Sequence, residues 1–126
     1  FLPILKMHPN AAIINITSGL AISPKKSSPI YCATKAALRA FTKSLRYQIE
    51  DAKLNIRVME VLPPVVDTPM TASNSSHSKI TSEEVAQDVI NGLLQNKKEV
   101  YVGKVWLLKM VHSISPSLAD MIMRNW

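Results

Sequence analysis

The chain has 126 residues, of which 47% are hydrophobic and 19% are charged, and its formal net charge is +6. This length suits one domain, and the apolar content excludes a disordered chain. No apolar run reaches the roughly 18 residues of a membrane-spanning helix, so we expect no membrane span. The first ten residues contain two prolines and no cleavage pattern, unlike a secretory signal.

The chain has one cysteine, Cys32, which cannot form an intramolecular disulfide and therefore fits a reducing, cytoplasmic location. Basic residues outnumber acidic ones by 15 to 9, a balance that would suit an anionic ligand or a nucleic acid. The charges are scattered, however, and the few aromatic residues form no stacking cluster, so we expect no nucleic-acid partner. The three histidines lack metal-ligand spacing, so we also expect no metal site.

The first half of the chain predicts two buried strands joined by a long helix. Residues 11–17 (AAIINIT) have apolar side chains on both faces, which is typical of a strand inside a parallel sheet. After a polar loop, residues 30–51 have helical periodicity with an alanine-rich side. Residues 56–62 (IRVMEVL) alternate apolar and polar positions and predict a second strand, which ends at Pro63-Pro64.

The second half opens with a polar stretch rich in Ser and Thr at residues 68–82, which predicts a loop. We expect residues 71–82 of this stretch to form a mobile substrate lid. Thr81 and Glu84 have the spacing of a capping box, which predicts a helix over 83–95.

Residues 99–102 (EVYV) predict a third strand, and residues 104–126 predict helices interrupted at Ser115-Pro116. The order strand-helix-strand-helix-strand-helix favours an α/β fold with a parallel sheet.

Tyr31 and Lys35 lie four residues apart at the start of the predicted helix, so they share one face. An ammonium beside a phenol favours the phenolate and lowers the pKa of the tyrosine, which suits a proton donor or acceptor. Alone, such a pair is more often a solvated surface contact. Ser18 follows the first strand at its carboxyl end, where open α/β sheets place their ligand crevice. Either Ser18 is only a turn residue before Gly19, or the three side chains form a proton relay for carbonyl reduction or alcohol oxidation.

These residues resemble those of the short-chain dehydrogenase/reductase family. The resemblance rests on the YCATK run at 31–35, which matches the family's YxxxK motif, and on INITS-G at 14–19. It also rests on the thirteen-residue spacing between Ser18 and Tyr31 and on VLPPVVDTPM at 61–70. The PP pair stands where the family usually has Pro-Gly, as in the DltE-like bacterial oxidoreductases within it.

The resemblance implies an NAD(P)-dependent oxidoreductase that interconverts a small-molecule carbonyl and an alcohol, with NAD or NADP as cofactor. Tyr31 would be the catalytic acid/base, Lys35 would lower its pKa and hold the nicotinamide ribose, and Ser18 would orient the substrate. The segment with Pro64, Val66 and Thr68 would contact the nicotinamide carboxamide.

The family's glycine-rich turn, which holds the cofactor pyrophosphate at a helix amino end, has no counterpart in this sequence. The three glycines, Gly19, Gly92 and Gly103, are far apart. We therefore expect residues 1–126 to form a single domain, the carboxyl-terminal, catalytic portion of a Rossmann-type doubly wound parallel sheet, with the cofactor-binding half absent. The residues that choose between NAD and NADP would lie in that half, and the chain alone would be inactive.

Two other roles compete with the enzyme. One is a catalytically silent interaction or assembly module that keeps the helix-pairing surface of the fold. The other is a membrane-surface protein, suggested by Trp106 and Trp126 in the apolar tail, although packing of that tail on the protein body is favoured. For the enzyme, the alanine-rich side of helix 30–51 predicts a homodimer or homotetramer.

Overall fold

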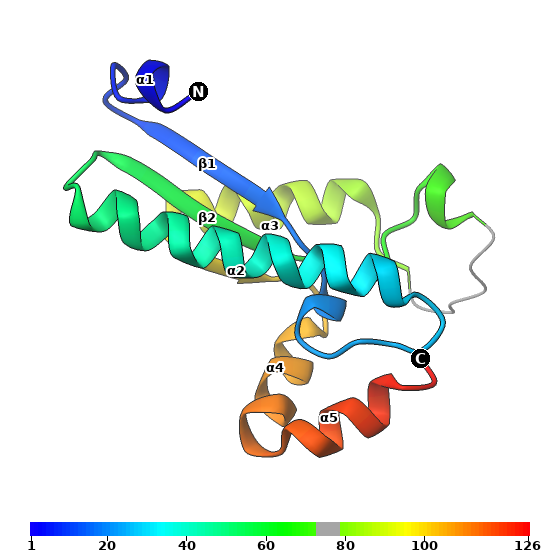
Figure 1. Ribbon diagram of the computed structural model, residues 1–126. Coiled ribbons are helices and arrows are strands. Elements are labelled where there is room, and N and C mark those ends of the chain that lie inside the picture. Colours follow the sequence, from blue (N-terminus) through cyan, green and yellow to red (C-terminus); the bar gives the residue numbers. More distant parts are fainter. Residues whose placement is uncertain (73–78) are drawn as a thin grey trace.

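The computed structural model describes residues 1–72 and 79–126 (Figure 1). Three strands, five α-helices and two short 3-10 turns are found in these ranges. In chain order they are α1 (Leu2–Leu5), β1 (Ala11–Ile16), η1 (Gly19–Ala21), α2 (Pro29–Asp51), β2 (Ile56–Leu62), η2 (Pro69–Thr71), α3 (Ser82–Leu94), β3 (Glu99–Tyr101), α4 (Val105–Ile114) and α5 (Pro116–Met123).

The predicted strands and long helices are confirmed, with ends that agree to within one residue. The predicted capping box also forms, since the Thr81 hydroxyl accepts from the backbone N–H of Glu84 and the Glu84 carboxylate accepts from that of Thr81. Ser115 caps α5 and Pro116 begins it, as the sequence predicts. Residues 73–78, which make up half of the predicted lid, lie outside the described residues.

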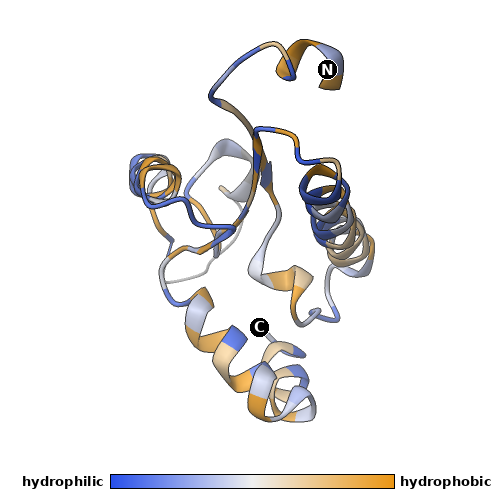
Figure 2. Cartoon of the chain, turned by 90° about the vertical axis from the view of Figure 1, so that its left-hand side faces the viewer, coloured by the Kyte–Doolittle hydropathy of each residue, from blue (hydrophilic) through white to orange (hydrophobic). Residues whose placement is uncertain are grey.

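The three strands form a parallel sheet in the order β1-β2-β3. Helix α2 covers one face, where Ile49 packs with Val58. Helix α3 covers the other face, where its apolar side chains pack around Met59. Figure 2 shows the strands between these two helices. The chain therefore has the α/β arrangement of a Rossmann-type sheet with helices on both faces.

Strand β2 differs in one respect from the sequence pattern. Its alternation of apolar and polar residues is typical of a strand with one solvent-exposed face, yet only Arg57 is exposed. Glu60 is 2% exposed. The reason is that β2 is the central strand of the three and has a helix over each face, so the Glu60 side chain points into the protein rather than into water.

Helices α4 and α5 pack below the carboxyl edge of the sheet (Figure 1). Met123 of α5 joins Leu20 and Cys32 in one apolar cluster. Hydrogen bonds from Ser23 to Asp120 (2.6 Å) and from Lys26 to Asn125 (2.6 Å) attach the loop before α2 to α5 and its end. None of the helices in residues 1–72 and 79–126 has both the length and the apolar character needed to span a bilayer.

Candidate functional site

The candidate site lies where β1 and β2 end. Backbone hydrogen bonds continue past the strands, from Thr17 N–H to Val61 O (2.8 Å) and from Gly19 N–H to Pro63 O (3.1 Å). Ser18 is thereby held beside the Pro63-Pro64 pair at the carboxyl edge of the sheet. This is the edge at which open α/β sheets bind ligands.

Ser18 has a structural role in the turn that follows β1. It is the N-cap of η1, and its hydroxyl oxygen accepts a hydrogen bond from the Leu20 N–H at 3.2 Å. Its side chain is buried, with 6% exposed. A hydroxyl both accepts and donates, so this cap leaves the hydroxyl proton available to a substrate oxygen. The turn role and the proposed substrate role are therefore compatible.

Tyr31 and Lys35 occupy the first turns of α2, which begins at Pro29 because proline suits the first helical position. The Lys35 Nζ lies 5.7 Å from the centroid of the Tyr31 ring and donates to the Ile16 carbonyl oxygen at 2.9 Å. Tyr31 is 38% exposed. The helix thus directs Lys35 to the end of β1, two residues before Ser18, and leaves the Tyr31 ring accessible.

The packing of η1 on α2 brings these segments together. Leu20, two residues after Ser18, packs with Cys32, the neighbour of Tyr31, in the cluster that Met123 completes. The three residues singled out in the sequence therefore come from the turn after β1 and from α2 to the same edge of the sheet. Within the described ranges, no group of three or more His, Cys, Asp and Glu side chains is gathered closely enough to hold a metal ion.

The segment after β2 holds the other predicted residues. Pro64 lies against Gly103, where a side-chain carbon would sit 3.6 Å from the proline ring. Val66 pairs with Ile80 in an isolated parallel bridge. The Thr68 N–H donates to the Thr71 hydroxyl (3.1 Å), which in turn donates to the Val66 carbonyl oxygen (2.5 Å). Pro64, Val66 and Thr68 thus lie along one braced segment leaving the same edge of the sheet.

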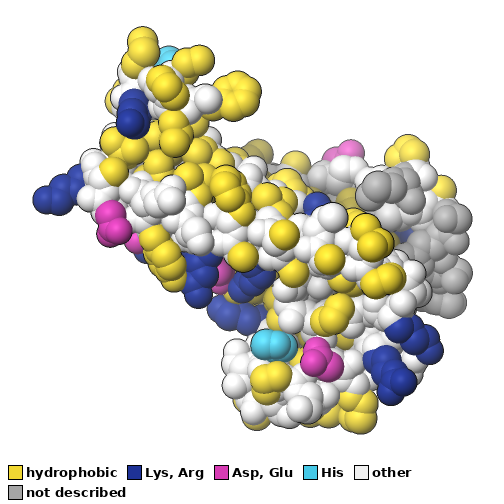
Figure 3. Space-filling model, in the orientation of Figure 1, with side chains coloured by type: hydrophobic (Ala, Val, Ile, Leu, Met, Phe, Trp, Pro, Cys, Tyr) yellow, Lys and Arg dark blue, Asp and Glu magenta, His cyan; other side chains and the backbone are white. Residues whose placement is uncertain are grey.

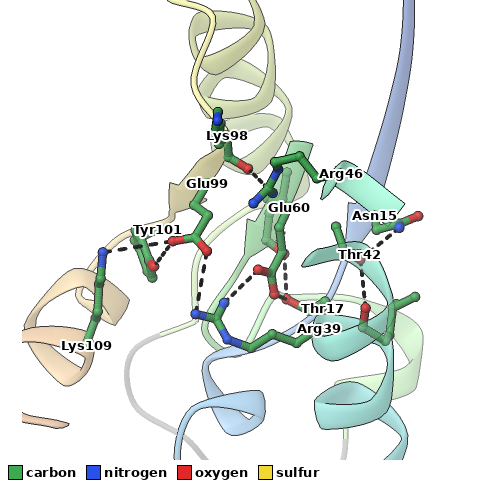
Figure 4. A network of polar contacts seen from close by, with 12 residues as sticks. Asn15, Thr17, Arg39, Thr42, Arg46, Glu60, Lys98, Glu99, Tyr101 and Lys109 are labelled. Atoms are coloured by element: carbon green, nitrogen blue, oxygen red, sulfur yellow. Dashed lines mark hydrogen bonds and ion pairs between the residues drawn. The ribbon is translucent and has the colours of Figure 1, made fainter. Parts of the chain in front are cut away.

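Sequence reasoning missed a polar network that spans all three strands on the α2 face (Figure 4). The Arg39 guanidinium lies 2.6 Å from the Glu60 carboxylate and 3.7 Å from Glu99. Glu60 also accepts from the Thr17 hydroxyl at 2.7 Å. Glu60 and Glu99 are register partners on neighbouring strands, an arrangement in which like charges repel. Arg39 lies between them and offsets that repulsion.

The outer part of the network has shifted pKa values. Burial raises the pKa of Glu99, but the hydrogen bond from Tyr101 and the charges of Arg39 and Lys109 outweigh burial, so the pKa is lowered. Burial and the Glu99 carboxylate raise the pKa of Tyr101. The Lys109 Nζ lies 4.6 Å from the Tyr101 ring centroid and 3.9 Å from Glu99. At neutral pH the cluster therefore holds a neutral phenol against a carboxylate.

A second polar group lies further along α2. Arg46 is 8% exposed and donates to the carbonyl oxygens of Val58 (3.0 Å) and Lys98 (2.8 Å). Thr42 accepts from the Asn15 amide at 2.8 Å. The only sequence signal for these contacts was that Asn15, Thr42 and Arg46 each stand next to an apolar residue in the sequence.

Comparison with known proteins gives the family of this chain. A family model described as short chain dehydrogenase matches residues 1–79. The chain therefore belongs to the short-chain dehydrogenase family.

Among curated proteins, the chain is 41% identical over 105 residues to the "Uncharacterized oxidoreductase DltE" of Bacillus subtilis, covering 79% of this chain and 41% of that protein. It is 40% identical over 67 residues to "Benzil reductase ((S)-benzoin forming)" of the same species, covering 53% of this chain and 28% of that protein.

Among solved structures, it resembles a short chain dehydrogenase from Burkholderia cenocepacia in complex with NADP, with a TM-score of 0.86 and 30% identity, covering 98% of this chain and 51% of that one. The chain thus spans about half of that structure and less than half of the curated relatives DltE and benzil reductase.

Proposed function

We propose that this chain carries the catalytic residues of an NAD(P)-dependent oxidoreductase that interconverts a small-molecule carbonyl and an alcohol. The observation that carries the proposal is the position of Lys35, whose ammonium faces the Tyr31 ring and holds the end of β1 beside Ser18. The similar Burkholderia cenocepacia protein was solved with NADP, which supports NADP or NAD as the cofactor.

In this proposal the nicotinamide, when bound, supplies or accepts the hydride. Tyr31 gives its phenolic proton to the substrate oxygen during reduction and takes it back during oxidation. Lys35 stabilises the phenolate electrostatically and binds the ribose of the cofactor. Ser18 donates its hydroxyl proton to the substrate oxygen and so orients the carbonyl toward Tyr31.

The residues of this chain fit the nicotinamide end of such a cofactor. Pro64, Val66 and Thr68 follow β2 at the edge that holds Ser18, and a backbone group or the Thr68 hydroxyl there would bind the carboxamide. The pyrophosphate end has a different requirement, a glycine-rich turn that a phosphate can approach. Each of the three glycines is instead packed against protein, Gly19 against Val105, Gly92 against Val100 and Gly103 against Pro64.

We therefore propose that residues 1–126 act as the carboxyl-terminal, catalytic part of the enzyme and that the pyrophosphate is bound by residues outside this chain. On that view the chain alone binds NADH or NADPH weakly. Titration of the 126-residue chain with each nucleotide tests this point. Micromolar affinity from a monomer would contradict it.

We also propose that two copies associate through α2. Its residues Ala33, Ala36, Ala37 and Ala40 are small and exposed, and Phe41 is 58% exposed beside them. Figure 3 shows hydrophobic side chains along this face of the molecule. Small side chains allow a partner helix to approach closely. Sedimentation of the complete gene product tests for the dimer or tetramer, and the single Cys32 supports a cytoplasmic location.

The decisive experiment for catalysis replaces Tyr31 in the complete gene product. Tyr31→Phe removes only the phenolic hydroxyl, and we expect kcat for carbonyl reduction to fall about 100-fold or more while cofactor affinity persists. Tyr47→Phe is the matched control, because Tyr47 lies on the same helix and is half exposed. A Tyr31→Phe rate within about threefold of wild type would refute the role of Tyr31.

A silent assembly module is the alternative, and the exposed apolar side of α2 favours it. It predicts association in sedimentation with no turnover of aldehydes, ketones or diketones by the wild-type protein with either nucleotide. Turnover that depends on Tyr31 would exclude this alternative.

A further inference from the structure

The centre of the sheet contains a charged side chain that the proposed reaction does not use directly. Glu60 lies on the central strand and is 2% exposed. One oxygen of its carboxylate accepts from the Thr17 hydroxyl at 2.7 Å, and the other lies 2.6 Å from the Arg39 guanidinium (Figure 4). The carboxylate therefore links β1, β2 and α2 through two short hydrogen bonds.

Stability alone gives little reason for this arrangement. Removing a carboxylate and a guanidinium from water costs several kcal/mol per ion, and well-packed apolar side chains of similar volume often do as well or better. The Glu99 carboxylate next to Glu60 in the register adds repulsion that Arg39 must offset. The contribution of the Glu60 carboxylate therefore lies in the relative positions of the segments that it connects.

That geometry relates directly to the candidate site. Thr17 immediately precedes Ser18, and its own N–H is bound to Val61 O. Arg39 lies one helical turn after Lys35 and two turns after Tyr31, so the three share a side of α2. Glu60 thus fixes the segment that carries Ser18 relative to the helix that carries Tyr31 and Lys35.

We propose that Glu60 is a positioning residue, which sets the distance between the Ser18 hydroxyl and the Tyr31–Lys35 pair through Thr17 on one side and Arg39 on the other. This inference rests on the proposed function. Thr17, Glu60 and Arg39 act in series, so a break at any point has the same consequence. Misplacing a reacting group by about 1 Å can cost about 100-fold in rate, so a small movement of Ser18 is enough to be measured.

The test uses three variants of the complete gene product. Thr17→Val removes the hydroxyl at constant shape, Thr17→Ser restores it, and Glu60→Gln keeps the size but loses the charge that Arg39 binds. We expect Thr17→Val and Glu60→Gln each to lower kcat about 10-fold with unchanged KM for the nucleotide, and Thr17→Ser to stay within about twofold of wild type.

Two double variants separate positioning from a merely structural effect. The pair Thr17→Val with Glu60→Gln should be no slower than either single variant, because both break the same link. In a Ser18→Ala background, Thr17→Val should have no further effect on kcat. The matched control is Thr42→Val, which removes another buried hydroxyl on the same face and should leave kcat within about twofold of wild type.

The outcomes are distinguishable. Thr17→Val and Glu60→Gln at wild-type rates, with Ser18→Ala at least about 10-fold slower, would overturn the positioning role and leave the proposed function intact. An equal loss from Thr17→Val with and without Ser18 would also overturn it. If Ser18→Ala and Tyr31→Phe both keep wild-type rates, the proposed function fails and this inference fails with it. Should Thr17→Val not fold, Thr17→Ser and Glu60→Gln still decide between these outcomes.

Discussion

The two faces of the sheet are held by different chemistry. On the α3 face, Met59, Val61 and Val100 of the strands meet Val85 and Val89 of the helix in an apolar cluster. On the α2 face, an apolar cluster around Val58 occupies only the end at which the strands begin. Toward the carboxyl edge, buried polar groups replace it.

The difference shows what each face contributes. Apolar contacts are non-directional, so they position α3 against the sheet through the fit of side-chain shapes. Hydrogen bonds and ion pairs require defined distances and angles, so they fix α2 relative to the strands. The helix that these polar contacts hold is the one that carries Tyr31 and Lys35.

The largest loss of stability should come from replacing Arg39, whose positive charge lies between two carboxylates on the α2 face. Arg39→Met leaves the Glu60 and Glu99 carboxylates as neighbours on adjacent strands, and breaking a buried pair in this way costs about 3 kcal/mol or more. Urea unfolding of the complete gene product measures the loss. The double variant Arg39→Met with Glu60→Gln should recover a large part of it. A single-variant loss below about 1 kcal/mol would show that the pair is solvated.

On the α3 face, the corresponding change is steric. A Cβ at Gly92 would lie 2.4 Å from a methyl group of Val100, so Gly92→Ala forces α3 away from the sheet. Overpacking of this kind costs about 1 to 3 kcal/mol, and the helix propensity gained returns up to about 1 kcal/mol. We expect a net loss of about 1 to 2 kcal/mol in urea unfolding. Combining Gly92→Ala with Val100→Ala should be less than additive, whereas simple additivity would contradict the close contact.

A smaller effect is expected from a neutral hydrogen bond on the α2 face. Thr42→Val keeps the shape of a fully buried side chain but leaves the Asn15 amide without its acceptor, at a cost of about 1 kcal/mol. Replacing both partners with valine should be closer to neutral, because no polar group is then left unpaired. Thermal unfolding of the two variants makes the comparison. Equal losses would mean that the Asn15–Thr42 bond has no net effect.

The smallest effect is a pH dependence that only the α2 face should show. The pKa of Glu99 is lowered from its ordinary value of 4.5, so its stabilising contribution is complete above that pH and is lost as the pH falls below it. The unfolding free energy of wild type should therefore fall as the pH is lowered from about 5 to about 3, and that of Glu99→Gln should fall less. Asp51→Asn, an exposed carboxyl at the end of α2, is the control. Identical acid profiles for wild type and Glu99→Gln would refute the contribution of Glu99.

The sequence contained enough information to predict the elements and the approximate place of the site. Apolar runs, the Thr81–Glu84 cap and the prolines are local signals, and each determined an element end. Ser18 at the end of a strand and Tyr31 at the start of the next helix come together whenever that helix returns over the sheet. Their placement at the same edge of the sheet is therefore also implied by local order.

The Glu60 network could not be predicted in this way. Residues Thr17, Arg39 and Glu60 are separated by more than 20 positions, and their contact depends on which strand is central. In isolation, a glutamate in an alternating strand has the pattern of a solvent-facing residue. Helix α2, which packs over the face on which Glu60 lies, makes that position an interior one.

The attachment of the loop before α2 to α5 has a consequence for the order of folding. Ser23 and Asp120 are 97 residues apart, and Lys26 and Asn125 are 99 apart. Contacts between such distant positions form late, because the chain must close a long loop before it gains them. During synthesis, α2 and the strands can assemble while α5 has not yet emerged from the ribosome. The loop that leads to Tyr31 therefore gains this attachment only after α5 has emerged, when the three strands can already have paired.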